Sequence, residues 1–213
     1  MERRLVAILA ADVVGFSRLM QLDEAGTLGA LKARRADILK PLVSRHHGRI
    51  MKFMGDGVLV EFASAVDAAR NAFDIQKSMA ALNADVAPDV RIEFRIGIHV
   101  GDIIADGSDI FGDGVNIAAR LEGLAEPGAV CVSDDAYRQV RGKVDIAFED
   151  LGPQVLKNIA EPMRVWRFAG QRAAKEGPAA AGTQALTLPD KPSIAVLPFQ
   201  NMSGDPEQEY FAD

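Results

Sequence analysis

The sequence of 213 residues contains one cysteine, no long apolar run and no block of basic residues. Because Cys131 has no partner within the chain, an intramolecular disulfide is excluded and a reducing compartment is favoured. No stretch reaches the roughly 18 consecutive apolar residues that a membrane-spanning helix needs. The net charge is −6, which argues against binding to nucleic acid or to an anionic membrane surface. These absences together predict a soluble, cytoplasmic protein.

The composition is that of a globular protein, with 48% hydrophobic and 25% charged residues. Large-scale disorder and collagen-like classes are therefore excluded. Residues 1–170 are predicted to form one domain. Half of residues 171–192 are alanine, glycine or proline, which predicts a linker. Residues 193–213 begin with a short apolar run that cannot bury itself alone, so they are interpreted as the truncated start of a second domain.

Hydrophobic periodicity predicts alternating strands and helices within residues 1–170. The predicted elements are a buried strand at 3–14, a helix from Asp23 to about His47, a hairpin of 49–54 and 58–62, a helix after Ser64, a half-buried strand at 91–100, a helix from 113 or 114 to 124, a strand at 129–132, a short helix from Ser133, and strands near 145–151 and 163–168. The antiparallel hairpin argues against a uniformly parallel sheet. An α+β fold, with a mixed sheet and helices packed on one face, fits this order better.

The first predicted strand also resembles a short signal peptide, because basic residues precede an apolar run. That run ends at Asp12 after about seven residues, at the short limit for a signal core. A strand that ends at an acidic residue explains the segment at least as well.

Two aspartates lie at the ends of predicted strands. Asp12 follows the first strand, and Asp56 lies in the hairpin turn. If the first strand lies beside the hairpin, both carboxylates reach the same edge of the sheet. The nearby glycines, Gly15, Gly55 and Gly57, would let backbone approach a phosphate, and paired carboxylates suit divalent metal ions. Taken singly, each aspartate is better explained as an ordinary turn residue.

Asn116 and Arg120 lie four residues apart near the start of a predicted helix, so they share one of its faces. An amide and a guanidinium in this arrangement suit a sugar ring and phosphate oxygens. Taken alone, the pair is better explained as an ordinary surface asparagine and an arginine paired with an acid such as Glu122.

Three segments, in this order and spacing, resemble the class III adenylate/guanylate cyclase catalytic domain. They are LAADVVGFS at 9–17, KFMGDG at 52–57 and DIFGDGVNIAAR at 109–120. The resemblance covers about residues 1–168 and matches six separate functional positions. It implies a ferredoxin-like α+β fold with a mixed, largely antiparallel sheet.

The resemblance assigns roles residue by residue. It implies that Asp12 and Asp56 bind two divalent metal ions, Mg²⁺ or Mn²⁺, and that Lys52 and Asp109 read the purine. A lysine that donates to a ring nitrogen and a carboxylate that accepts from an amino group match adenine rather than guanine. Guanylate-type members of the family carry glutamate and cysteine at these two positions.

The remaining assignments concern the sugar and the phosphates. The resemblance implies that Asn116 orients the ribose and that Arg120 stabilises the charge that develops on the phosphate. It assigns Gly15 and Phe16 to substrate binding, and Lys157 to the triphosphate by a looser match.

The implied reaction is attack of the ATP ribose 3′-oxygen on the α-phosphorus, which yields cyclic AMP and pyrophosphate. The family builds each active site across a dimer, so a homodimer with two equivalent sites is expected. The alternatives are a catalytically silent nucleotide-binding dimerisation module and a guanylate cyclase. A cyclic dinucleotide synthase is disfavoured because its Gly-Gly-Asp-Glu-Phe-type signature is absent. Residues 191–213 resemble the opening of a TolB-like domain.

Overall fold

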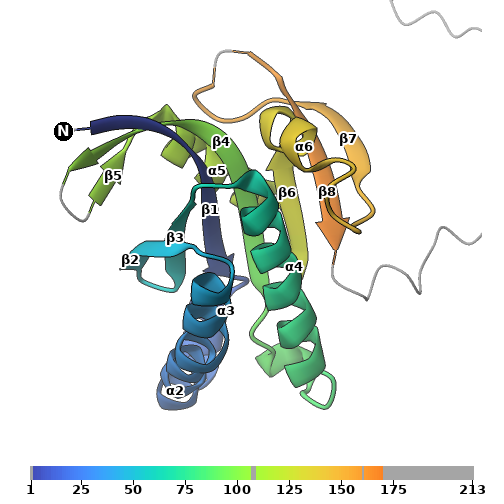
Figure 1. Ribbon diagram of the computed structural model, residues 1–213. Coiled ribbons are helices and arrows are strands. Elements are labelled where there is room, and N and C mark those ends of the chain that lie inside the picture. The colour runs from blue at the N-terminus through green and yellow to red at the C-terminus, as the bar shows by residue number, and fades with distance from the viewer. Residues whose placement is uncertain (1, 107–108, 160, 170–213) are drawn as a thin grey trace, which may run out of the picture. The chain divides into compact units, whose positions relative to one another are not determined.

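The computed structural model describes residues 2–106, 109–159 and 161–169 (Figure 1). These residues form a sheet with the strand order β2-β3-β1-β4-β6-β8-β7, and β5 pairs with β4. The strands are β1 (Glu2–Val13), β2 (Arg49–Met54), β3 (Gly57–Phe62), β4 (Phe94–Asp106), β5 (Asp109–Phe111), β6 (Ala129–Ser133), β7 (Glu149–Gln154) and β8 (Met163–Ala169). The β4–β6 pair is parallel and the other pairs are antiparallel, so the sheet is mixed, as predicted.

The helices connect these strands. They are α1 (Phe16–Leu22), α2 (Glu24–Arg34), a π-helical turn η1 (Arg35–Leu39), α3 (Lys40–Arg45), α4 (Ala65–Leu82), a short 3₁₀ turn η2 (Pro88–Val90), α5 (Asp113–Leu124) and α6 (Asp134–Val140). The Asp23 side chain caps α2 by accepting a hydrogen bond from the Gly26 amide, as the sequence predicts. The predicted helix to His47 exists, but its middle turn is π-helical. The separate helix α1 was not predicted.

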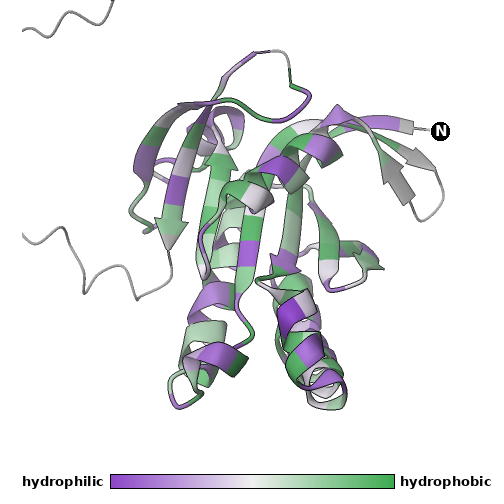
Figure 2. Cartoon of the chain, turned by 180° about the vertical axis from the view of Figure 1, so that it is seen from behind, coloured by the Kyte–Doolittle hydropathy of each residue, from purple (hydrophilic) through white to green (hydrophobic). Residues whose placement is uncertain are grey.

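Both faces of the central strands are buried. Leu9 and Ile98 belong to the main core, which also takes in residues of α2 to α4, whereas Ile8 packs on the opposite face with Ala118 of α5. Figure 2, a view from behind, shows α5 lying across that second face. A β-carbon on Gly97 of β4 would lie 2.2 Å from the carbonyl oxygen of Ala118, so the absence of a side chain lets α5 pack closely.

This packing corrects one detail of the predicted architecture. The helices were expected on one face of the sheet, and α5 lies on the other. The physical reason is that β1 is apolar on both faces, from Val6 to Ala11, so both faces need a covering layer.

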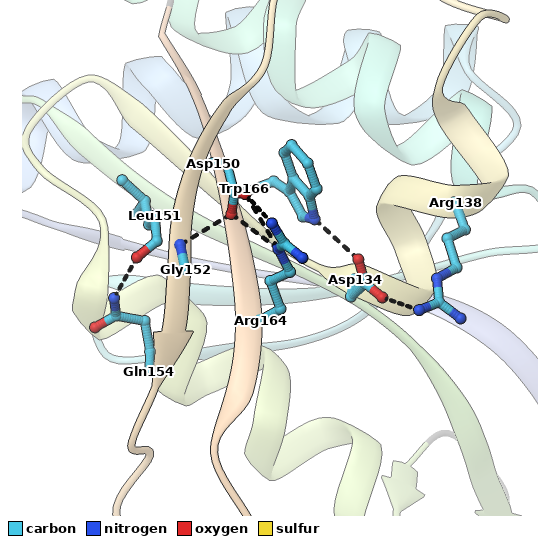
Figure 3. Close-up of polar contacts among 8 residues, drawn as sticks. All are labelled: Asp134, Arg138, Asp150, Leu151, Gly152, Gln154, Arg164 and Trp166. Carbon is cyan, nitrogen blue, oxygen red and sulfur yellow. Dashed lines mark hydrogen bonds and ion pairs between the residues drawn. The ribbon is translucent and has the colours of Figure 1, made fainter.

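The edge formed by β7 and β8 is tied to α6 by polar and aromatic contacts (Figure 3). Arg164 of β8 pairs with Asp150 of β7, and the indole nitrogen of Trp166 donates to Asp134 of α6 at 3.0 Å. The Trp166 ring also stacks on Tyr137, with centroids 3.7 Å apart. Trp166 therefore has a structural role at this edge.

The predicted linker, 171–192, and the predicted second domain, 193–213, lie outside the described residues. Both therefore stay predictions. None of the helices in the described part of the chain is long and apolar enough to span a membrane.

Candidate active site

The structure brings Asp12 and Asp56 to the same place, as the sequence predicts. Strands β1 and β3 are antiparallel neighbours, with Ala11 opposite Val58. The amide of Val13, the residue after Asp12, donates a hydrogen bond of 3.1 Å to Oδ2 of Asp56. This bond fixes the Asp56 carboxylate against the backbone that carries Asp12.

The local backbone of the hairpin explains how the turn reaches β1. Gly55 has a φ of 59°, a left-handed conformation that favours glycine. Gly57 lies against β1, and a β-carbon on it would be 3.9 Å from Cβ of Asp12 and 3.2 Å from the carbonyl oxygen of Ala11. The glycines on both sides of Asp56 thus permit the sharp turn and its close approach to β1.

Arg95 is part of this site, and the sequence did not identify it. It lies opposite Asp12 in the β1–β4 register. Its guanidinium donates two hydrogen bonds to the Asp12 carboxylate, at 3.0 and 2.6 Å. The alternation of β4 placed Arg95 on the less apolar face, but only strand pairing shows that this face carries Asp12. The site therefore holds a fixed positive charge beside its carboxylates.

Glu122 of α5 is a second residue that the sequence did not place here. Its carboxylate lies 3.2 Å from Arg95, and its side chain is 14% exposed. Burial, followed by a hydrogen bond and repulsion from Asp12, raises the pKa of Glu122 to about 8, against the opposing effect of Arg95. In metal-free protein near neutral pH, the raised pKa leaves Glu122 largely protonated.

The raised pKa of Glu122 gives a prediction about stability. Between its usual value of 4.5 and its folded value of about 8, the folded state binds more protons than the unfolded state. Glu122 therefore lowers the free energy of unfolding as the pH rises, by at most about 1.4 kcal/mol per unit. We expect Glu122→Gln, which cannot ionise, to gain stability relative to the wild type between about pH 5 and pH 8. Melting temperatures in EDTA at each pH measure this difference.

Because His99 also makes the stability depend on pH, the melting temperature of the variant must be compared with that of the wild type at each pH. Burial lowers the pKa of this histidine, so it makes the protein more stable as the pH rises, opposite to Glu122. His99 is common to both proteins and cancels in the difference. A stability difference that does not change with pH would contradict the assigned pKa of Glu122.

The donor set at this edge fits a divalent cation that is shared with a substrate. Among the described residues, no group of three or more histidine, cysteine, aspartate or glutamate side chains could hold a metal ion. Mg²⁺, however, is commonly bound by one or two carboxylates together with substrate phosphates. A carboxylate has about four acceptor positions, so Asp12 retains some beside those that Arg95 uses. Asp12 and Asp56 therefore fit a metal that a nucleotide triphosphate helps to coordinate.

The two residues predicted to read the purine lie on two strands that contact each other but are not paired in the sheet. Lys52 is half-buried on β2, an edge strand of the sheet. Asp109 begins β5, and β2 and β5 contact each other. The side chain of Asp109 lies outside the described part of the structure, so its predicted role stays a prediction.

Asn116, Arg120 and Lys157 are all exposed. Asn116 and Arg120 are exposed on α5. Leu156 is buried in the same cluster as Leu121 of α5, so the loop that presents the exposed Lys157 lies against this helix. Within the described residues, no hydrogen bond or ion pair joins this group to Asp12 or Asp56.

Gly15 and Phe16 lie directly after β1. Gly15 is exposed and its carbonyl begins α1 by accepting from the Arg18 and Leu19 amides. The Phe16 side chain is partly buried against the main core. The Phe16 ring thus takes part in core packing, whereas the Gly15 backbone is exposed, and their predicted role in substrate binding stays a prediction.

Comparisons with known proteins show the family to which the chain is similar. A family model described as the adenylate and guanylate cyclase catalytic domain matches residues 2–170. A Rhizobium meliloti protein named "Putative adenylate cyclase 3" is 53% identical over 212 residues, which cover 100% of this chain and 36% of that protein. A Streptomyces coelicolor adenylate cyclase is 36% identical over 138 residues, covering 65% of this chain and 34% of that protein. The chain spans about a third of the length of these relatives.

Solved structures show the same fold. An adenylate/guanylate cyclase/hydrolase from Silicibacter pomeroyi is 44% identical, with a TM-score of 0.75 over 80% of this chain and 99% of that one. The adenylyl cyclase CyaB from P. aeruginosa is 26% identical, with a TM-score of 0.69 over 80% of this chain and 96% of that one. The mixed α+β fold described above is therefore confirmed.

Proposed function

Since this chain belongs to the adenylate and guanylate cyclase catalytic domain family, we propose that it converts ATP into 3′,5′-cyclic AMP and pyrophosphate. The observation that carries the proposal is the meeting of Asp12 and Asp56, held by the hydrogen bond from Val13 to Asp56. An oxygen-only donor pair beside a fixed guanidinium is suited to a metal–triphosphate substrate. The product would serve as a second messenger.

The metal site would be formed by Asp12 and Asp56, with Mg²⁺ or Mn²⁺ as the ions. Two bound ions would supply Lewis acidity at the ribose 3′-hydroxyl and at the phosphate oxygens. The Val13 amide holds Asp56 in place, and Arg95 holds Asp12 by a bidentate contact. Arg95 also places positive charge where a triphosphate would lie, because it is beside the metal-binding carboxylate.

The choice of purine would rest on Lys52 and Asp109. Lysine is a donor only and an ionised aspartate is an acceptor only, which matches the ring nitrogen and the amino group of adenine. Guanine presents the reverse pattern, with a carbonyl and a ring N–H, and would leave polar groups unpaired.

The catalytic unit would be a symmetric homodimer with two active sites. Asn116 and Arg120 are exposed on α5 and have no hydrogen bond to the carboxylates among the described residues. A second copy that brings these side chains, with Lys157, to Asp12 and Asp56 would complete each site. In that arrangement Asn116 orients the ribose and Arg120 stabilises the developing charge on the α-phosphate.

The direct test is to incubate the purified chain with ATP or GTP, in Mg²⁺ or Mn²⁺, and to measure the products by mass spectrometry. We expect cyclic AMP from ATP, with kcat/KM exceeding that for GTP by about tenfold or more. Cyclic GMP formed from GTP in excess of cyclic AMP from ATP would instead identify a guanylate cyclase. No product from folded, dimeric protein would favour the alternative of a silent nucleotide-binding module.

A separate variant tests whether Lys52 and Asp109 select the purine. Lys52→Glu combined with Asp109→Cys is expected to shift the preference toward GTP, because the donor and acceptor pattern at the base is then reversed. Lys77→Gln, at an exposed lysine of α4, lowers the net charge by one, as the double variant does, and is the charge-matched control that should retain the preference for ATP. An unchanged ratio in the double variant would contradict the assigned roles.

A further inference from the structure

Arg35 makes several contacts with the turn that carries Asp56. Its Nη2 donates a hydrogen bond to the carbonyl oxygen of Gly55. Its guanidinium carbon lies 4.5 Å from the centroid of the Phe53 ring, within the range of a cation–π contact. One side chain thus contacts β2 and the turn that follows it.

The electrostatic surroundings of Arg35 also include the turn that carries Asp56. Burial lowers the pKa of Arg35, and the Asp56 carboxylate opposes this shift. Nε of Arg35 is buried without a hydrogen-bond partner. The guanidinium is therefore partly desolvated, with the Phe53 ring, the Gly55 carbonyl and the Asp56 charge as its surroundings.

The backbone at Arg35 is also unusual. Arg35 is the first residue of the π-helical turn η1, and its carbonyl accepts a hydrogen bond from the amide of Lys40, five residues later. Single π-helical turns inside α-helices are rare and are frequent at functional sites. Here the π turn begins at the residue whose side chain reaches the hairpin.

The turn has few other attachments. Within the described residues, hydrogen bonds join residues 55 and 56 to elements outside the hairpin at two points, from Val13 to Asp56 and from Arg35 to Gly55. β2 lies at the end of the sheet, so it is paired on one side only. The turn is thus held from one side by β1 and from the other by Arg35.

We propose that Arg35 is a positioning residue for metal binding, which holds the β2–β3 turn so that Asp56 stays beside Asp12. The inference rests on the proposed function, because it assumes that these carboxylates bind the metal. Arg35 itself does not touch the metal or the substrate. It acts through Gly55 and Phe53, as residues behind a ligand commonly do in metal sites.

The test measures Mn²⁺ binding directly, by electron paramagnetic resonance, in the presence of 3′-deoxy-ATP, which lacks the attacking oxygen. We expect Arg35→Gln to raise the Kd for Mn²⁺ by about tenfold. Arg35→Lys should lie between the variant and the wild type, since an ammonium can donate to Gly55 but cannot stack as a planar fork. Arg45→Gln, at an exposed arginine of α3, is the matched control and should leave the Kd unchanged.

A double-mutant cycle with Asp56→Asn separates positioning from a general effect on the fold. If Arg35 acts through Asp56, then Arg35→Gln should not weaken Mn²⁺ binding further in the Asp56→Asn background. An equal loss in both backgrounds would overturn the inference. So would a lowered melting temperature of Arg35→Gln with an unchanged Kd.

The outcomes distinguish this inference from the proposed function. Absence of Mn²⁺ binding by the wild type would overturn both. Tight binding by the wild type that is unchanged in both Arg35→Gln and Arg35→Lys would overturn only the role of Arg35. If Arg35→Gln does not fold, Arg35→Lys and Phe53→Leu carry the test, and each must weaken Mn²⁺ binding for the inference to stand.

Discussion

Replacing Asp56 with asparagine is expected to reduce kcat for cyclic AMP formation by about a thousandfold, because it removes a metal-binding charge where the transition state needs it. Asparagine is the most informative substitution here. Its side-chain oxygen can still accept the hydrogen bond that Val13 donates to Asp56 in the wild type. The turn should therefore keep its place while the charge is lost.

The measurement is a steady-state assay at saturating ATP and Mn²⁺, together with a melting temperature for each protein. Asp85→Ala, at an exposed aspartate beyond α4, is the control and should retain wild-type kcat. A melting temperature of Asp56→Asn close to that of the wild type would show that the loss is chemical. Asp56→Asn with more than about a tenth of wild-type kcat would rule out its role as a metal ligand.

Mixing two inactive variants is expected to restore activity. In a symmetric dimer, a subunit with Asp56→Asn and a subunit with Arg120→Ala form one site with both defects and one site with neither. Random exchange makes half of the dimers mixed, and each mixed dimer has one intact site of two. The mixture should therefore recover up to about a quarter of wild-type activity, although each variant alone is nearly inactive.

The matched control mixes Asp56→Asn with Asp12→Asn. The structure places both aspartates in the same part of the site, since Asp56 is bonded to the residue after Asp12. Every site in that mixture therefore contains one defective carboxylate, and no activity should return. Recovery in this control, or its absence in the first mixture, would contradict a site shared between subunits.

The sequence predicted most helices and strands because hydrophobic alternation, capping residues and turn residues are short-range features of the chain. The alternation at 91–100 places Phe94, Ile96 and Ile98 on one face of β4, and all three are fully buried. Ser64 and Ser133 begin α4 and α6 as capping residues. The Gly55-Asp56-Gly57 turn appears where the hairpin was predicted.

The elements that the sequence did not predict depend on contacts between distant residues. The π-helical turn at 35–39 and the helix α1 have no distinctive local signal. The position of α5 on the second face follows from the fit of Gly97 against Ala118, more than 20 residues later in the chain. Such a contact leaves no periodicity in either segment.

The same distinction holds for the candidate site. The sequence by itself determined which side chains we propose for the chemistry, because Asp12, Asp56, Asn116 and Arg120 stand in motifs with a definite spacing. Only the tertiary structure decided that Arg95 and Glu122 surround Asp12, and that Arg35 reaches the Asp56 turn. Strand register and helix packing set these neighbours, and both are selected by burial over the whole fold rather than by any local segment.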